Sequence, residues 1–286
     1  MPKTTAENAF GTLYVVATPI GNLSDLSLRA RQVLADATVV AAEDTRHTGQ
    51  LLAHLGLSKP MVSMHEHNEA GRAGEIVQRL RRGESVAVVS DAGTPLISDP
   101  GFEVVRAAIA AEMPIVAIPG PSAVITALSV AGLATDRFAF EGFLPAKSAA
   151  RHDRLQALSR DPRTLVYYEA PHRLLETLTD IAAVLGSERR VVVARELTKQ
   201  FESIYRGSAQ ELAQLAARDT DMCRGEVVIV IAGASNEIAP DLAAAESTLS
   251  VLLEELPPAQ AARLASKLTG AKRSELYDLA VERKPK

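Results

Sequence analysis

The chain has 286 residues, of which 47% are hydrophobic and 23% are charged, a composition typical of a globular protein with one large domain or two smaller ones. With 31 lysines and arginines against 35 acidic residues, its net charge of −4 excludes the overall positive field of a small basic protein that binds nucleic acid. A single cysteine, Cys223, excludes an internal disulfide and a cysteine-rich zinc site, and it favours a cytoplasmic, reducing location.

The first part of the sequence predicts an N-terminal α/β domain over residues 11–123, after a flexible tail at 1–10 that lacks the apolar segment of a signal peptide. Short β-branched runs alternate there with longer amphipathic segments, which is typical of βαβ units and a mostly parallel sheet. The expected strands are residues 13–18, 38–43, 61–66, 85–92 and 114–120. The expected helices are residues 27–37, 48–56, 70–83 and 102–112.

Residues 113–135 carry no charge, but Pro119, Gly120 and Pro121 interrupt them too early for a membrane span. We therefore expect a strand, a loop and a buried helix here, and no membrane association. Residues 124–235 predict a second α/β domain that is richer in strands. Its expected strands are residues 138–144, 163–170, 189–198, 201–208 and 225–233, and its clearly helical segments are residues 173–186 and 209–219.

The remaining residues, 236–286, predict a linker and a small helical C-terminal domain. The linker is expected at 234–245, and residues 257–284 favour a helix, a turn at Gly270 and a second helix, which is close to a helix-turn-helix pattern. Basic residues outnumber acidic ones by seven to three over the last 28 residues. Two interpretations stay open: an element that binds nucleic acid, and a solvated helical hairpin.

Each predicted strand of the first domain runs into a loop rich in glycine, proline and short polar residues. The carboxyl ends of parallel strands share one edge of the sheet, where ligands bind. No Gly-x-Gly-x-x-Gly follows the first strand and no Gly-Lys-Ser/Thr loop occurs, which argues against a dinucleotide oxidoreductase and a P-loop NTPase. Rigid loops of this kind suit a flat ligand such as a nucleoside, unless they only connect strands. The loops are residues 18–22, 43–46, 65–69, 90–95 with 99–101, and 119–123.

Eight motifs occur in order along the chain, and together they resemble the tetrapyrrole-methylase superfamily of S-adenosylmethionine enzymes. They are GTLYVVATPIGNLSD, AAEDTRHTGQLL, SMHEHNE, VVSDAGTPLISDPG, AIPGPSA, YYEAPHR, RELTKQFE and RGEVVIVIAG. The resemblance covers about residues 11–235 and is strongest to the branch that methylates the ribose 2′-hydroxyl of a cytidine in small-subunit (16S) ribosomal RNA. The helical C-terminal segment is similar to the extension of that branch.

This resemblance implies two α/β units with a cleft between them, S-adenosyl-L-methionine as the cofactor, and small-subunit ribosomal RNA or the assembled subunit as the partner. The positions that match the cofactor site of relatives are Pro19, Asp91, Gly93, Thr94, Ser122, Ala123, Tyr168, Glu226 and Val227. Relatives that modify porphyrins have a glycine-rich first loop, whereas residues 17–21 contain one glycine, so a porphyrin substrate is not carried over. Relatives are also dimers, and the uncharged residues 113–135 are a candidate interface of a homodimer.

Methylation of a ribose hydroxyl requires that its proton leave before or during the transfer, so a basic side chain near the acceptor would help. We predict that Asp44, Glu169 and Lys199 form the catalytic neighbourhood. Each of them could instead form a salt bridge between the two units. Two other functions also stay open: methylation of a tetrapyrrole or a protein side chain, and a non-catalytic role as an RNA-binding assembly factor.

Cationic and histidine side chains supply the candidate contacts to RNA. They are Arg46, His65, His67, Lys147, Arg151, Arg173 and Arg195. Lys147 and Arg151 belong to a basic stretch over 147–163, which is either a phosphate-binding patch at the cleft or a solvated helix face. The run His65-Glu66-His67 could bind a metal ion, but methyl transfer needs none, so we expect hydrogen-bonding histidines and no metal.

Overall fold

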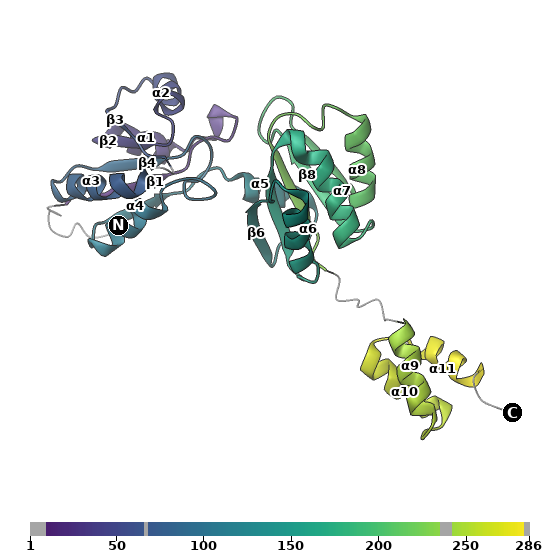
Figure 1. Cartoon of the computed structure of the whole chain (residues 1–286). Helices are drawn as coiled ribbons and strands as arrows, with labels where there is room; N and C mark the ends of the chain where they lie inside the picture. Colours follow the sequence, from purple (N-terminus) through teal and green to yellow (C-terminus); the bar gives the residue numbers. More distant parts are fainter. Residues whose placement is uncertain (1–9, 66–67, 235–241, 283–286) are drawn as a thin grey trace. The chain divides into compact units, whose positions relative to one another are not determined.

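The computed structural model describes residues 10–65, 68–234 and 242–282 (Figure 1). Their contacts define two compact units. The first unit holds both sheets, with residues up to 159 and residues 163–232, and the second holds residues 160–162 and those from 233 onward. None of the described helices is long and apolar enough to cross a membrane.

The first sheet is entirely parallel and contains all five strands predicted for the first domain. Its strands are β1 (Leu13–Val16), β2 (Val39–Ala42), β3 (Met61–Ser63), β4 (Val86–Val89) and β5 (Ile115–Ile118), in the order β3-β2-β4-β1-β5. The helices that connect them are α1 (Leu28–Asp36), α2 (Thr45–His54), α3 (Glu69–Arg81) and α4 (Phe102–Ala110). Every residue of β2 and β4 is buried, as expected for strands that are covered on both faces.

Alternate residues of these strands pack into two separate cores. Leu13 and Val88 pack with Ile76 and Leu80 of α3, whereas Val16 and Val40 lie in the other cluster. Side chains at alternate positions of a strand point to opposite faces of its sheet, so the β-branched runs supply both cores at once.

The second sheet is mixed and also contains the five strands predicted for it. Its strands are β6 (Phe138–Phe143), β7 (Thr164–Glu169), β8 (Arg190–Arg195), β9 (Ser203–Ser208) and β10 (Val227–Ile231), in the order β6-β7-β10-β8-β9. Only β6 and β7 are parallel within this sheet; the other neighbours are antiparallel. Its helices are α5 (Ala123–Ala131), α6 (Ser148–Ala157), α7 (Leu174–Leu185) and α8 (Ala209–Arg218); α6 was not among the clearly helical segments predicted, although a helix was one interpretation of the basic stretch that contains it.

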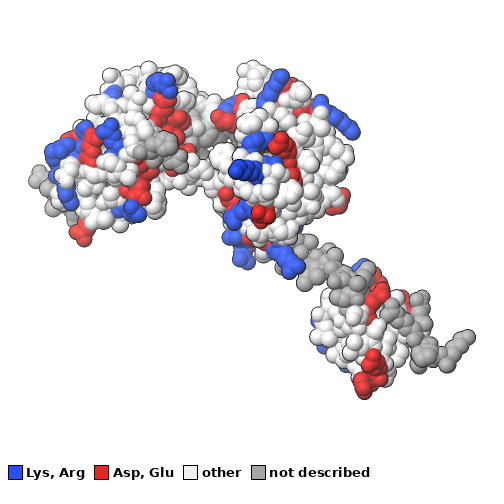
Figure 2. Space-filling view, in the orientation of Figure 1, with Lys and Arg blue, Asp and Glu red and all other residues white. Residues whose placement is uncertain are grey.

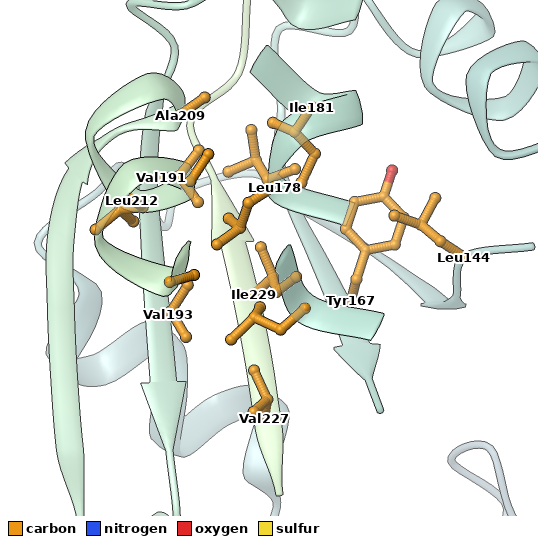
Figure 3. Packing of buried hydrophobic residues seen from close by; sticks show 14 of the residues in the cluster. Leu144, Tyr167, Leu178, Ile181, Val191, Val193, Ala209, Leu212, Val227 and Ile229 are labelled. Atoms are coloured by element: carbon orange, nitrogen blue, oxygen red, sulfur yellow. The ribbon is translucent and has the colours of Figure 1, made fainter. Parts of the chain in front are cut away.

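One face of the second sheet packs against α7 and α8, and the other packs against α5. Figure 3 shows Val191, Val193 and Ile229 of the strands facing Leu178 of α7 and Leu212 of α8. The opposite cluster joins residues 192, 194, 228 and 230 of the strands to residues 124, 127 and 128 of α5. Ile20, from the loop that follows β1, packs into this second cluster. The loop therefore reaches the core of the second sheet.

The described part of the second unit contains three helices, one more than the predicted pair. They are α9 (Leu242–Leu253), α10 (Pro258–Thr269) and α11 (Arg273–Glu282), packed around Leu249, Ala262 and Leu276. Gly270 ends α10 in a left-handed conformation, at the predicted turn. The predicted linker extended to Ala245, which is wrong at its end because α9 begins at Leu242.

Candidate functional site

Three of the predicted strand-end loops of the first domain contact one another directly. The backbones of Thr18 and Gly93 exchange two hydrogen bonds, of 2.8 and 3.1 Å, so the loops after β1 and β4 are joined. Thr94 Oγ1 donates to the carbonyl of Pro121 at 3.0 Å and adds the loop after β5. Gly93 has a φ of 80°, which favours glycine, and a Cβ there would lie 3.2 Å from Ile20. The three loops form one rigid edge.

A cavity of about 410 Å³ lies beside this edge and is also lined by the ends of β7 and β10. Most of the predicted cofactor residues line it: Asp91, Gly93, Thr94, Ser122, Ala123, Tyr168, Glu226 and Val227. Pro19 does not line this cavity and instead lines a neighbouring one. The structure thus brings together residues from both sheets that are as far apart in the chain as Ile20 and Val228.

Several residues of this cavity were not among the predicted cofactor residues, although Ile20, Glu43 and Asp99 lie in the predicted strand-end loops. Two are carboxylates: Glu43, directly after β2, and Asp99, in the loop between β4 and α4. The apolar ones include Ile20, Ile97, Phe143 and Leu197. Ile20 and the two carboxylates lie in loops that follow strands, which is the signal that could have identified them; Ile97, Phe143 and Leu197 carry no such signal. The ring of Tyr168 packs edge-on against the rings of residues 140 and 143, with centroids 4.9 and 5.7 Å apart.

Carboxylates, among them Glu43, Asp91 and Asp99, are prominent in the lining of this cavity. Burial, together with the negative charge of Glu43, raises the pKa of Asp99 to about 6, against its ordinary value of 3.8. Burial, and next the charge of Asp99, raises the pKa of Tyr168 to about 12. Near neutral pH the cavity therefore combines ionised carboxylates and a neutral phenol with an apolar wall, and it suits a ligand with both positive charge and an apolar ring.

Asp44 caps the N-terminus of α2 rather than facing a free acceptor. Its Oδ1 accepts a hydrogen bond from the backbone of Arg46 at 2.7 Å, and its Oδ2 lies 2.7 Å from the Arg46 guanidinium. These hydrogen bonds hold the pKa of Asp44 well below its usual range. A carboxylate with so low a pKa is a poor proton acceptor near neutral pH. The Arg46 side chain itself is largely exposed.

Glu169 is buried at the end of β7, where its hydrogen bonds are made within the protein. It accepts from Thr177 Oγ1 at 2.6 Å and from the backbone of Ala170 at 2.8 Å, and Arg173 Nε lies 3.3 Å away. Arg173 donates in addition to the carbonyl of Leu144 at 2.7 Å. This network connects the end of β7 to the helix that follows it. The guanidinium of Arg173 is therefore held by groups of the protein itself, although we predicted a contact with RNA.

Lys199 lies in a turn between β8 and β9 that contains two left-handed residues, Glu196 with φ of 51° and Thr198 with φ of 65°. Its Nζ is 3.0 Å from Glu196 Oε1 and 3.0 Å from Glu226 Oε2. Burial lowers the pKa of Lys199, but the hydrogen bonds to the two carboxylates outweigh it and raise that pKa above its usual value. Lys199 is therefore a fixed cation and not a base. The strained turn that holds it is typical of a functional site.

Of the other predicted RNA contacts, Arg151 is contradicted by its burial. It is 1% exposed, and its Nε donates to Asp180 at 2.5 Å, so it is an internal residue of α6 and cannot meet a phosphate. Arg195 donates to the carbonyls of Arg224 and Phe201 at 2.7 and 3.0 Å. Lys147, before α6, is exposed.

His65 is exposed at the end of β3, where its ring lies 3.1 Å from Asn68 Nδ2. His67, with Glu66, lies outside the described residues. On the face of the first unit that Figure 2 shows, basic and acidic side chains are interspersed. A nucleic acid bound to that face would therefore contact individual basic side chains and not a continuous basic surface.

A second cavity, of about 440 Å³, adjoins the first. The two share Ile20, Asp91, Ala92 and Glu226 as lining residues, so these form a common wall. The rest of the second cavity comes from the loop after β1, from α2 and from Lys199: Thr18, Pro19, Gly21, Leu23, His47, Gln50, Leu51, His54 and Lys199.

Two families match the chain in separate segments. Residues 12–213 match the Tetrapyrrole (Corrin/Porphyrin) Methylases, and residues 239–284 match the RsmI C-terminal HTH domain. The solved structure of uroporphyrin-III C-methyl transferase from Thermus thermophilus complexed with S-adenyl homocysteine is similar with a TM-score of 0.55 and 19% identity. That likeness covers 78% of this chain and 97% of the other, and it shows a common fold.

Curated relatives match nearly the whole chain. The ribosomal RNA small subunit methyltransferase I of Xylella fastidiosa (strain Temecula1) is 54% identical, over 93% of this chain and 98% of its own length. The protein of the same name from Pseudomonas aeruginosa is 52% identical, over 96% of this chain and 99% of its own length.

Proposed function

Since the chain belongs to the ribosomal RNA small subunit methyltransferase I family, within the tetrapyrrole methylases, we propose that it methylates the ribose 2′-hydroxyl of a cytidine in small-subunit ribosomal RNA. The methyl donor is S-adenosylmethionine. The substrate is the RNA itself or the assembled small subunit, and action on it implies a cytosolic location.

The observation that carries this proposal is the chemistry of the first cavity, the one also lined by the ends of β7 and β10. Its volume of about 410 Å³ fits a ligand of nucleoside size, for which sites of roughly 300–1,000 Å³ are usual. S-adenosylmethionine carries a sulfonium and an ammonium group, which suit the carboxylates of Glu43, Asp91 and Asp99. Its adenine suits the apolar wall at Ile97 and Leu197. When bound, it supplies an electrophilic methyl group.

The protein's part in such a displacement is to hold the acceptor oxygen in line and to exclude water. We assign Lys199 the stabilisation of the negative charge that grows on the 2′-oxygen as its proton leaves, because Lys199 stays protonated and lies beside the common wall. Glu169 and Arg173 would act as positioning residues for the end of β7, and Asp44 for the start of α2.

Calorimetry with S-adenosylmethionine and methyl incorporation into small subunits test the proposal together. Subunits are taken from a strain that lacks this gene, and the methylated nucleotide is mapped. We expect cofactor binding and one modified cytidine ribose. A protein that binds no cofactor is an assembly factor, and one that methylates free tetrapyrrole or protein but not subunits has a different acceptor.

We also propose that the protein is a homodimer through residues 113–135. Support comes from exposed apolar side chains of this segment: Val116 on the edge strand β5 is 40% exposed, and Ile125 on α5 is 55% exposed. Unpartnered apolar surface of this kind favours association. Sedimentation should show a dimer that Ile125→Glu dissociates; a monomeric wild type contradicts the proposal.

A further inference from the structure

The second cavity has a distinct wall that is built from one face of α2. His47, Gln50, Leu51 and His54 all line it. Their spacing of three, four and seven residues places them above one another on a single helical face. The opposite wall consists of the loop after β1, at Pro19, and of Lys199. The cavity therefore lies between a helix face and a cationic turn.

The polar side chains of this helix face are the second notable feature of the cavity. Among the described residues, the side chains of His47, Gln50 and His54 make no hydrogen bond or ion pair, although all three are exposed on the cavity side. By contrast, Asp44 at the start of the same helix is fully engaged by Arg46. Imidazole and amide groups both donate and accept hydrogen bonds, so these three side chains are available to a ligand with mixed donors and acceptors.

Pro19, Leu23 and Leu51 give the same cavity apolar surface beside these polar groups. Apolar or aromatic faces combined with a few donors and acceptors are the means by which proteins hold an unstacked base. The volume of about 440 Å³ accommodates a ligand of that size. The cavity thus has the chemistry expected for one nucleotide taken out of its stack.

From these observations, we propose that the second cavity holds the acceptor nucleotide and that His47, Gln50 and His54 recognise its base. The proposal rests on the methylation of RNA argued above. If the base packs against α2, its ribose lies at the wall formed by Ile20, Asp91, Ala92 and Glu226. The first cavity, which we propose holds the methyl donor and which we call the donor cavity, lies on the other side of this wall. Lys199 Nζ, 3.0 Å from Glu226, is the cation of that wall.

The test replaces the helix face and measures methyl transfer and cofactor binding separately. The variants are Gln50→Ala and the double variant with His47→Ala and His54→Ala. The matched control is Gln78→Ala, the same substitution at an exposed position of α3 that lines neither cavity. Alanine is the best helix former, so the substitutions should not weaken the helices.

We expect kcat/KM for unmethylated small subunits to fall about tenfold for Gln50→Ala and further for the double variant, since each loses base contacts worth a factor of this order. The Kd for S-adenosylhomocysteine should stay within twofold of the wild type. Reconstituted subunits with uridine at the target position give a readout of recognition: the wild type should prefer cytidine, and the variants should discriminate less. The control should match the wild type throughout.

Three outcomes would overturn the proposal. Unchanged transfer in the double variant would show that the helix face does not contact the acceptor. A parallel loss of S-adenosylhomocysteine binding would assign the second cavity to the donor. Reduced transfer with full discrimination against uridine would make the face a general RNA contact. A wild type that does not methylate subunits at all contradicts the proposed function instead, so the two failures are distinguishable.

Discussion

Asp91 is a lining residue of both cavities, and its Oδ1 accepts a hydrogen bond from the backbone of Asp44 at 3.1 Å. We expect Asp91→Ala to weaken S-adenosylmethionine binding by about 1–3 kcal/mol, because a donor group of the ligand would lose its partner. Asp91→Asn keeps an acceptor for the Asp44 amide but lacks the charge, so an intermediate loss is expected. Calorimetry measures the Kd for S-adenosylmethionine of variants whose Tm is unchanged. An unchanged Kd for Asp91→Ala would show that Asp91 does not contact the ligand.

Asp99 makes the stability of the protein depend on pH. Its pKa is raised from 3.8 to about 6 by burial and by the charge of Glu43, so the folded protein holds this proton more tightly than the unfolded chain. The free energy of unfolding therefore falls as pH rises from about 4 to about 6, and the loss is complete above that range. Asp99→Asn removes this contribution.

Thermal unfolding across this range measures the effect. The Tm of Asp99→Asn, relative to the wild type, should rise between pH 4 and pH 6.5 and then level off. A difference between the two proteins that does not change with pH would show that the Asp99 carboxyl is not held in its neutral form.

At single residues, the sequence predicted which residues line the first cavity better than it predicted the partners of individual charged side chains. Asp91 and Thr94 follow β4 and Tyr168 lies near the end of β7, all within recognisable motifs, and strand ends converge by topology alone. Whether a charge is free depends on partners distant in sequence: Arg151 meets Asp180, 29 positions away. No local pattern reveals such a pairing, which explains why Arg151 was wrongly assigned to the surface.

Among the elements, α8 has the strongest local start signal. Ser208 accepts from the backbone of Glu211 at 3.2 Å, and Glu211 Oε2 accepts from the backbone of Ser208 at 2.8 Å, which is a complete capping box. We expect Ser208→Ala to cost about 1 kcal/mol of stability without affecting cofactor binding. Chemical denaturation measures the loss, and Ser208→Thr, which retains a hydroxyl cap, should restore most of it. Equal losses in both variants would mean that the cap contributes little.

Strands were predicted more reliably than helices because the sequence shows their continuous β-branched, apolar runs directly, as in β2, β4 and β10, whose residues are all buried. In β8, Val191 and Val193 pack on one face while Val192 and Ala194 pack on the other. Helix α6 was missed because its buried residues are only Arg151 and Leu155, which give no apolar periodicity. Helix α2 begins three residues before the predicted start because the Asp44 side chain caps it.

For the whole molecule, the division into two compact units predicts that cofactor binding and RNA binding can be separated. The second unit carries Arg263, Lys267, Lys272 and Arg273, and none of its described residues lines either cavity. Ending the chain after Ala234 should leave the Kd for S-adenosylmethionine unchanged and weaken RNA binding. Each lost phosphate contact should also reduce the log–log salt slope by about 0.7 for single-stranded RNA.

Filter binding at several salt concentrations measures both quantities. An unchanged affinity and slope in the folded, shortened protein would identify the C-terminal helices as a hairpin without an RNA contact. Loss of cofactor binding would contradict the assignment of the donor site to the first unit.

The position of β10 has a consequence for the nascent chain. This strand is the last of its sheet to be synthesised, yet it lies in the middle, paired with β7 on one side and β8 on the other. Until Val227–Ile231 has left the ribosome, the two neighbours lack their common partner, and Glu226 and Val227 are missing from the donor cavity. The enzyme should therefore become able to capture its cofactor late, in a single step near the end of translation. Stalled chains that end at residue 224 should not retain S-adenosylhomocysteine, whereas chains whose first unit is fully exposed should.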